Sequence, residues 1–242
     1  MSLSVFSGII LPFIGTTLGS AAVFLSRKTH NTPQNAPLYG FSAGVMMAAS
    51  VWSLIIPAVN MSVSFGFFSF VPPILGIWLG ILFMLAAERH LSFLGHENLM
   101  FLAVILHNIP EGMAVGIAFA PAFAQHSPSL ILSALVLSFA MTMQNIPEGA
   151  IVSLVLAEKG ESKSKSFILG SLSGIAEPVF AFITLLLSTV FAMFLPYFLG
   201  FSAGAMIYIS ANELIPKADT VKGTLFFTLG FCVMMVLDIA LG

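Results

Sequence analysis

The chain consists of long apolar stretches separated by short polar ones. A helix rises about 1.5 Å per residue and the hydrocarbon core of a bilayer is about 30 Å thick, so about 20 mainly apolar residues can cross a membrane. The stretches that meet this criterion cover residues 3–26, 38–59, 66–88, 98–124, 128–157, 165–191, 194–216 and 223–241. The pattern therefore predicts an all-α integral membrane protein with eight transmembrane helices.

The connections between these stretches are short, so consecutive helices are expected to be antiparallel neighbours. They leave no room for a separate soluble unit, and residues 1–242 are expected to form a single transmembrane domain. The first stretch lacks a basic start and an Ala-x-Ala cleavage site, so it is interpreted as a retained span and not as a signal peptide.

Composition agrees with a membrane environment. The 242 residues are 58% hydrophobic and only 7% charged, with a mean hydropathy of +1.05, whereas soluble domains carry about a quarter charged residues. The single cysteine, Cys232, excludes both a disulfide framework and a cysteine-based zinc cluster. The expected partners are the lipid bilayer and small ions. No nucleic-acid partner is expected, and a homodimer is left open.

The basic residues predict the orientation in the membrane. All of them fall in alternate connections, on one side of the predicted bundle: Arg27, Lys28, Arg89, Lys159, Lys163, Lys165, Lys217 and Lys222. Basic loops stay cytoplasmic by the positive-inside rule. Both termini are therefore expected to be extracellular, in a multi-pass protein of the cell membrane.

A short phrase occurs twice in the middle of the chain. Residues 107–112 read His-Asn-Ile-Pro-Glu-Gly and residues 144–149 read Gln-Asn-Ile-Pro-Glu-Gly, each inside a predicted span. Because spans 4 and 5 are consecutive, the two copies run in opposite directions.

A second repeat joins spans 2 and 7. Residues 40–46 read Gly-Phe-Ser-Ala-Gly-Val-Met and residues 200–206 read Gly-Phe-Ser-Ala-Gly-Ala-Met, and each copy continues to Leu-Ile and a proline. We expect both copies to run from outside to inside. Pseudo-symmetric internal repeats are typical of secondary transporters, although the glycines alone are equally consistent with a small-residue packing stripe.

Acidic residues lie inside the apolar stretches. Glu111, Glu148, Glu177 and Glu213 fall within predicted spans, where a charge costs at least about 2.5 kcal/mol and usually marks a site or pathway. Asp238, four residues from the C-terminus, is interpreted instead as an outer-surface charge.

Helical geometry gathers several polar side chains. Residues three or four apart share a helix face, and counting from the inner ends of the spans at about 1.5 Å per residue gives depths of roughly 14–20 Å. The set at this depth is His107, Asn108, Glu111, Gln144, Asn145, Glu148 and Glu177. Three prolines, Pro110, Pro147 and Pro178, remove backbone donors at the same level and are expected to free the carbonyls of Leu106, Met143 and Gly174.

The chemistry of this set favours a divalent transition metal. One imidazole with carboxylate and amide oxygens suits Zn²⁺, Fe²⁺ or Mn²⁺, and two carboxylates can bridge two ions. The alternative is a buried polar network that only holds helices together. That alternative needs cationic partners, and no Lys or Arg lies in the middle of any span.

Nearer the inner end of span 7, Ser210, Asn212 and Glu213 are interpreted as an exit path for an ion. The alternative for Glu213 is an ordinary carboxylate that reaches the interface.

The combination of these motifs resembles the ZIP (Zrt-, Irt-like protein) family of divalent-metal transporters over essentially the whole chain. The resemblance implies uptake of Zn²⁺ into the cytosol, often with Fe²⁺, Mn²⁺, Co²⁺ or Cd²⁺, through a two-ion site between spans 4, 5 and 6. It places the first ion at His107, Glu111, Gln144 and Glu148. It places the second at Asn108, Asn145 and Glu177, with Glu111 and Glu148 bridging.

The chain departs from the family pattern in places. Gln144 stands where many members have His, and Asn145 where some have Asp. The sequence therefore predicts a transporter that has no prosthetic group and is not an enzyme. The alternatives are an intramembrane metalloenzyme, for which His-Glu-x-x-His is missing, and a membrane metal sensor.

Overall fold

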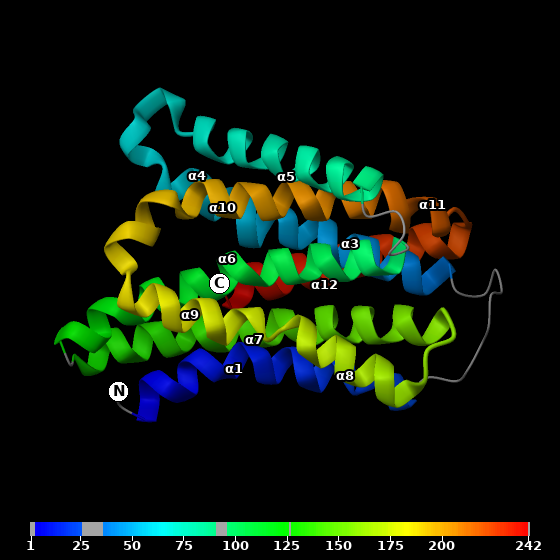
Figure 1. Ribbon diagram of the computed structural model, residues 1–242, viewed down its shortest axis with the longest axis horizontal. Helices are drawn as coiled ribbons and strands as arrows, with labels where there is room; N and C mark the ends of the chain where they lie inside the picture. The colour runs from blue at the N-terminus through cyan, green and yellow to red at the C-terminus, as the bar shows by residue number, and fades with distance from the viewer. Residues whose placement is uncertain (1–2, 26–35, 91–95, 126, 242) are drawn as a thin grey trace.

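The computed structural model describes residues 3–25, 36–90, 96–125 and 127–241, and these residues are helical almost throughout, without a strand among them (Figure 1). Helices long and apolar enough to cross a membrane cover Leu3–Leu25, Ala36–Met61, Val71–His90, Val104–Ala124, Pro128–Glu158, Lys163–Leu186, Ser188–Lys217 and Val221–Ala240. The prediction of an all-α protein with eight membrane spans is confirmed for the described residues.

The elements follow one another as α1 (Leu3–Ser20), α2 (Ala22–Leu25), α3 (Ala36–Ala49), η2 (Ser50–Ile55), α4 (Ile56–Met61), η3 (Val63–Phe68), α5 (Val71–His90), α6 (His96–Gln125), α7 (Pro128–Glu158), α8 (Lys163–Ser173), α9 (Ala176–Leu186), α10 (Ser188–Ile209), η5 (Ser210–Leu214), α11 (Ile215–Lys217) and α12 (Val221–Leu241).

Two predicted boundaries are displaced. Span 3 begins at Val71 and not at residue 66, because residues 63–68 form a short 3₁₀ helix in which Gly66 has a φ of +57°. Span 6 ends at Leu186 and the next helix begins at Ser188. The chain stays apolar across this turn, so hydrophobicity alone does not locate it.

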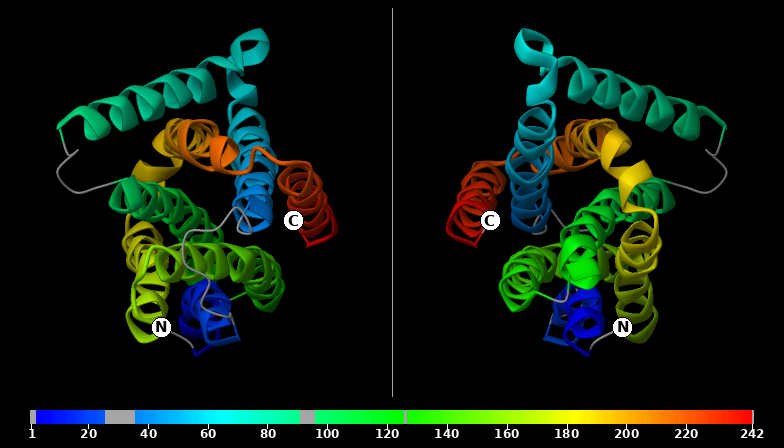
Figure 2. Two further views of the ribbon diagram at one scale, coloured as in Figure 1. Left: turned by 90° about the vertical axis from the view of Figure 1, so that its right-hand side faces the viewer. Right: turned by 90° about the vertical axis from the view of Figure 1, so that its left-hand side faces the viewer.

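The helices pack as two groups. In the first, α1 packs extensively on α7, α6 packs on α9, and α8 lies along α7 and α1; we call this the α7 group. In the second, α3 packs on α12 and α5 packs on α10; we call this the α3 group. The end-on views in Figure 2 show α3, α5, α10 and α12 in one half of the molecule and α1, α7, α8 and α9 in the other. The groups meet mainly where α6 contacts α10 and α7 contacts α12.

Glycines of the second repeat bring helices of the α3 group into close contact. A Cβ at Gly44 would meet the Phe227 carbonyl oxygen on α12, and a Cβ at Gly204 would meet the Ile77 carbonyl oxygen on α5. Small residues of this kind let helix backbones approach closely in a membrane. The packing-stripe interpretation of these glycines is therefore confirmed.

The two copies of the second repeat run in opposite directions. Figure 1 shows α3 leading from the right of the view to α4, whereas α10 leads from the left to α11. The expectation of a shared direction was wrong, because an even and an odd span of an antiparallel series must be opposed. Each copy continues into a π-helical turn, η2 after α3 and η5 after α10, so the repeats are inverted copies with the same local distortion.

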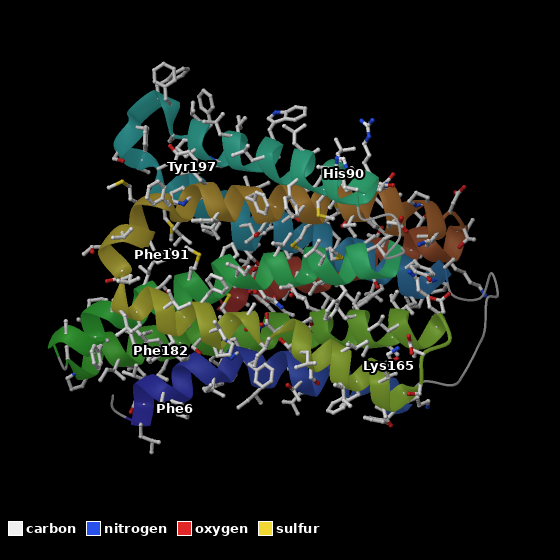
Figure 3. All side chains as sticks on the ribbon, in the orientation of Figure 1. Phe6, His90, Lys165, Phe182, Phe191 and Tyr197 are labelled. Atoms are coloured by element: carbon white, nitrogen blue, oxygen red, sulfur yellow. The ribbon has the colours of Figure 1, made fainter. Side chains whose placement is uncertain are left out.

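Described basic residues gather at one end of the bundle. In Figure 3, His90 and Lys165 lie at this end and Phe6 and Tyr197 at the other. Arg89 belongs to the last turn of α5, Lys217 ends α11, and Lys222 is the second residue of α12. Arg27 and Lys28 lie outside the described residues.

We predict that Gly204→Leu destabilises the protein by about 1–3 kcal/mol, because the new side chain would push α10 away from α5. Thermal unfolding of purified protein in detergent measures the effect. Ala86→Leu, which places the same final side chain on an exposed face of α5, is the matched control and should leave the free energy of unfolding within about 0.5 kcal/mol of the parent. Equal melting temperatures for both variants would contradict the packing account.

Candidate metal-binding site

Three side chains of the repeated phrases that could ligate a metal ion meet between α6 and α7. His107, Glu111 and Glu148 each place a donor atom within 4.8 Å of the others. His107 Nε2 lies 3.1 Å from Glu148 Oε1 and 3.2 Å from Glu111 Oε1. Only the first of these contacts has hydrogen-bond geometry. All three side chains are at most 5% exposed, so the predicted convergence of the two phrases is observed.

The glycine that ends each phrase sets the position of a neighbouring helix. A Cβ at Gly112 would meet the carbonyl oxygen of Glu177 on α9, and a Cβ at Gly149 would meet that of Thr16 on α1. The phrase on α6 therefore admits α9 at close range, and the phrase on α7 admits α1. This packing brings Glu177 up to the polar residues of α7.

Glu177 is held by two side chains. Asn145 Nδ2 donates to its Oε2 at 2.6 Å, and Thr16 Oγ1 donates to its Oε1 at 3.2 Å. On the other phrase, Asn108 Nδ2 donates to the Ser173 carbonyl at 2.8 Å. Both asparagines thus use their NH₂ groups on neighbouring helices, and neither amide oxygen has a hydrogen-bond partner.

Many buried polar atoms around this site have no hydrogen-bond partner among the described residues. They are His107 Nδ1, Asn108 Oδ1, both carboxylate oxygens of Glu111, Gln144 Oε1, Asn145 Oδ1, Glu148 Oε2 and Asp238 Oδ2. Leaving a buried polar atom without a hydrogen bond costs about 1–3 kcal/mol, and more when the group is charged. A network whose role was only structural would need cations to pair with, and the spans hold no Lys or Arg at this level. Oxygen donors with one imidazole suit a divalent metal ion.

The prolines act differently on their helices. α6 and α7 continue past Pro110 and Pro147 as helices. Span 6 is broken at residues 174–175, between α8 and α9. The prediction of a free Gly174 carbonyl was wrong, because the break lets it accept the backbone N–H of Glu177 at 3.2 Å.

Asp238 belongs to this region and not to the outer surface, so its predicted placement was wrong. It is 8% exposed, and its Oδ1 accepts from Ser53 Oγ at 2.6 Å and from Gln144 Nε2. Here α12 lies against both α3 and α7, and this packing covers the side chain. The signal in the sequence was an acid inside the last apolar stretch, the same signal that identified Glu111 and Glu148.

The three predicted exit residues lie together on η5. Ser210 is buried and its Oγ has no hydrogen-bond partner. Asn212 is exposed and donates to Glu88 Oε2 at 3.4 Å. Glu213 accepts from Lys217 Nζ at 2.5 Å, so it forms an ion pair within η5 and α11.

Eight apolar spans around a buried cluster of metal-type donors define a membrane protein that handles cations. The sequence profile described as ZIP Zinc transporter matches residues 96–238. The zinc transporter ZIPB of Bordetella bronchiseptica is 36% identical over 95% of this chain and 79% of its own length. The chain therefore belongs to the ZIP family of metal ion transporters, which confirms the resemblance and identifies it as a transporter and not an enzyme.

Two further relatives agree with this assignment. The zinc transporter GufA of Myxococcus xanthus is 32% identical over 96% of this chain and 97% of its own length. The zinc transporter ZIP11 of Xenopus tropicalis is 29% identical over 97% of this chain and 96% of its own length.

We predict opposite effects of Glu111→Gln on stability with and without metal. In chelator, the variant should be more stable by about 1–3 kcal/mol. It removes the charge of one of two buried carboxylates that share the His107 imidazole, and neither oxygen of Glu111 accepts a hydrogen bond. In Zn²⁺ at about 100 times the dissociation constant, the parent should gain about 2.7 kcal/mol, and the variant should gain less because it lacks one anionic ligand.

Glu161→Gln is the matched control for this comparison, since Glu161 is a solvent-exposed partner of Lys165 at 2.7 Å. It should behave as the parent under both conditions. A Glu111→Gln variant that melts below the parent in chelator, or responds to Zn²⁺ equally, would contradict the site.

Proposed function

We propose that the protein moves divalent transition-metal ions into the cytosol, Zn²⁺ foremost, through a two-ion site between spans 4, 5 and 6. The observation that carries this proposal is the set of buried, unpartnered donors on α6 and α7 at a level where the spans supply no cation. A desolvated divalent ion satisfies these donors, and its charge offsets that of the carboxylates.

The first ion binds His107, Glu111, Gln144 and Glu148. Supporting this assignment, the donor atoms of His107, Glu111 and Glu148 lie within 4.8 Å of one another. The second ion binds Asn108, Asn145 and Glu177, with Glu111 and Glu148 bridging. Supporting it, the amide oxygens of Asn108 and Asn145 are unpartnered, and Glu177 contacts Asn145.

The donor set favours transition metals over Ca²⁺ or Mg²⁺, since it includes an imidazole nitrogen. Zn²⁺ is the primary substrate in this proposal. Fe²⁺, Mn²⁺, Co²⁺ and Cd²⁺ are secondary substrates, because Gln144 supplies an amide oxygen where a second imidazole would favour Zn²⁺ more strongly.

The division into two helix groups supports alternating access. The proposed ligands all belong to the α7 group, on α6, α7 and α9. The α3 group contacts one of these ligands, Gln144, through Asp238. It also contacts the residue before His107, because Ser202 Oγ donates to the Leu106 carbonyl at 2.8 Å. Sliding one group past the other carries the ligands as a unit from one side of the membrane to the other.

Ions then leave the site past Ser210, Asn212 and Glu213. Protonation of Glu111 or Glu148 assists release, because protons and the metal ion compete for the same oxygens.

Glu148→Ala and Glu111→Ala should each abolish Zn²⁺ uptake into proteoliposomes, because each removes a bridging carboxylate. Uptake is measured with a zinc-sensitive dye inside the vesicles, and unlabelled Fe²⁺, Mn²⁺, Co²⁺ or Cd²⁺ outside measures the range of substrates. Glu161→Gln should transport at the parent rate. Parent-like flux in folded Glu148→Ala protein would remove the site assignment.

The proposed orientation puts both termini and the α6–α7 turn outside the cell. In a variant in which Cys232 is replaced by Ser, a cysteine at Ser129 should react with an impermeant maleimide on intact cells. A cysteine at Lys222 should react only after the cells are opened, because the basic end faces the cytosol. The reverse pattern of labelling would invert the proposed direction.

A further inference from the structure

Asp238 joins the two helix groups at the edge of the metal ligands. It lies on α12, and its neighbour Ser53 lies on η2, so both belong to the α3 group. Gln144 lies on α7 and belongs to the other group. The hydrogen bond from Gln144 Nε2 to Asp238 Oδ1 is thus a contact between the two helix groups. Asp238 itself lies outside both repeated phrases.

The orientation of the Gln144 amide decides whether it can bind a cation. An amide has a carbonyl oxygen, which accepts, and an NH₂ group, which only donates. Here the NH₂ group is directed to Asp238, and the carbonyl oxygen Oε1 is buried without a partner. An amide turned the other way would present hydrogens to the ion.

We propose that Asp238, itself held by Ser53, is a positioning residue that turns the carbonyl oxygen of Gln144 toward the transported ion. This inference rests on the proposed function of the site and adds a residue to it. A ligand bound to a metal becomes a stronger donor at its other end, and a carboxylate placed there strengthens the ligation. Because Asp238 lies on the opposite group, it supports Gln144 only while the groups are arranged as observed.

A different role for Asp238 would be direct contact with the ion through Oδ2, which is buried and has no partner. The variant Asp238→Asn distinguishes a positioning role from direct contact with the ion. Both observed hydrogen bonds end on Oδ1, so the single carbonyl oxygen in Asp238→Asn can keep both of them. The same variant loses Oδ2 as a possible ligand.

The test is equilibrium binding of Zn²⁺ to the purified full chain in detergent. Asp238→Ala should weaken binding by about tenfold, at the low end for residues that support a metal ligand. Asp238→Asn should recover most of this loss. Ser53→Ala should weaken binding less than Asp238→Ala, since it removes one contact at Oδ1. Ser42→Ala is its matched control on the same span, because Ser42 Oγ bonds only the Leu38 carbonyl of its own helix.

A double-mutant cycle separates positioning from ligation. In a Gln144→Ala background, Asp238→Ala should cause no further loss of Zn²⁺ affinity, because the amide that it orients is absent. Affinity losses that add in the double variant, or an Asp238→Asn variant as weak as Asp238→Ala, would overturn the positioning role. Parent-like binding in Asp238→Ala would do the same.

If the proposed function is wrong, the experiment gives a result different from failure of the positioning role, because the unaltered chain then binds no Zn²⁺ at the buried site. If Asp238→Ala does not yield monodisperse protein, Ser53→Ala and Asp238→Asn decide the question. Positioning predicts weaker binding in the first and near-parent binding in the second. Parent-like binding in Ser53→Ala together with a tenfold loss in Asp238→Asn would contradict it.

Discussion

The structure depends on one constraint, the burial of acceptor oxygens that the protein does not satisfy. In a bilayer interior, polar groups must find partners inside the protein. The helices pair their backbones and many serines and threonines bond to nearby carbonyls. Both oxygens of Glu111, one oxygen of Glu148 and the amide oxygens of Asn108, Gln144 and Asn145 have no hydrogen-bond partner among the described residues. A site built in this way is stable only when a cation or protons occupy it, and that requirement connects the fold to ion transport.

Small residues make this arrangement possible. The last glycine of each repeated phrase admits a helix of the α7 group, and the glycines of the second repeat do the same within the α3 group. The candidate ligands are consequently held on a closely packed unit of their own. The other group carries the inverted repeats with their π-helical turns. It packs on α6 and α7 through a shared apolar cluster, and it makes polar contacts from Asp238 to Gln144 and from Ser202 to the Leu106 carbonyl. Placing the candidate ligands on one group, beside a largely apolar interface with the other, suits a transporter that must move one part against the other.

Much of this could be predicted from the sequence because two strong patterns coincide. Apolar stretches of sufficient length located the eight spans, and residues four apart on a helix had to share a face, which brought His107 and Glu111 together. What could not be predicted depended on tertiary packing. The position of Asp238 follows from the docking of α12, and the turn near Leu187 lies inside an apolar run. The ion pair of Glu213 with Lys217, by contrast, joins residues four apart, so the same spacing rule could have predicted it.

The central claim is that a divalent ion is bound by the donors of both repeated phrases at once. Anomalous X-ray diffraction from crystals of the Zn²⁺-loaded protein tests it most directly. The account predicts a peak between α6 and α7, with His107 nitrogen and the carboxylate oxygens of Glu111 and Glu148 about 2.0–2.2 Å from it. Peaks confined to surface residues such as His90, with none between these helices, would contradict it.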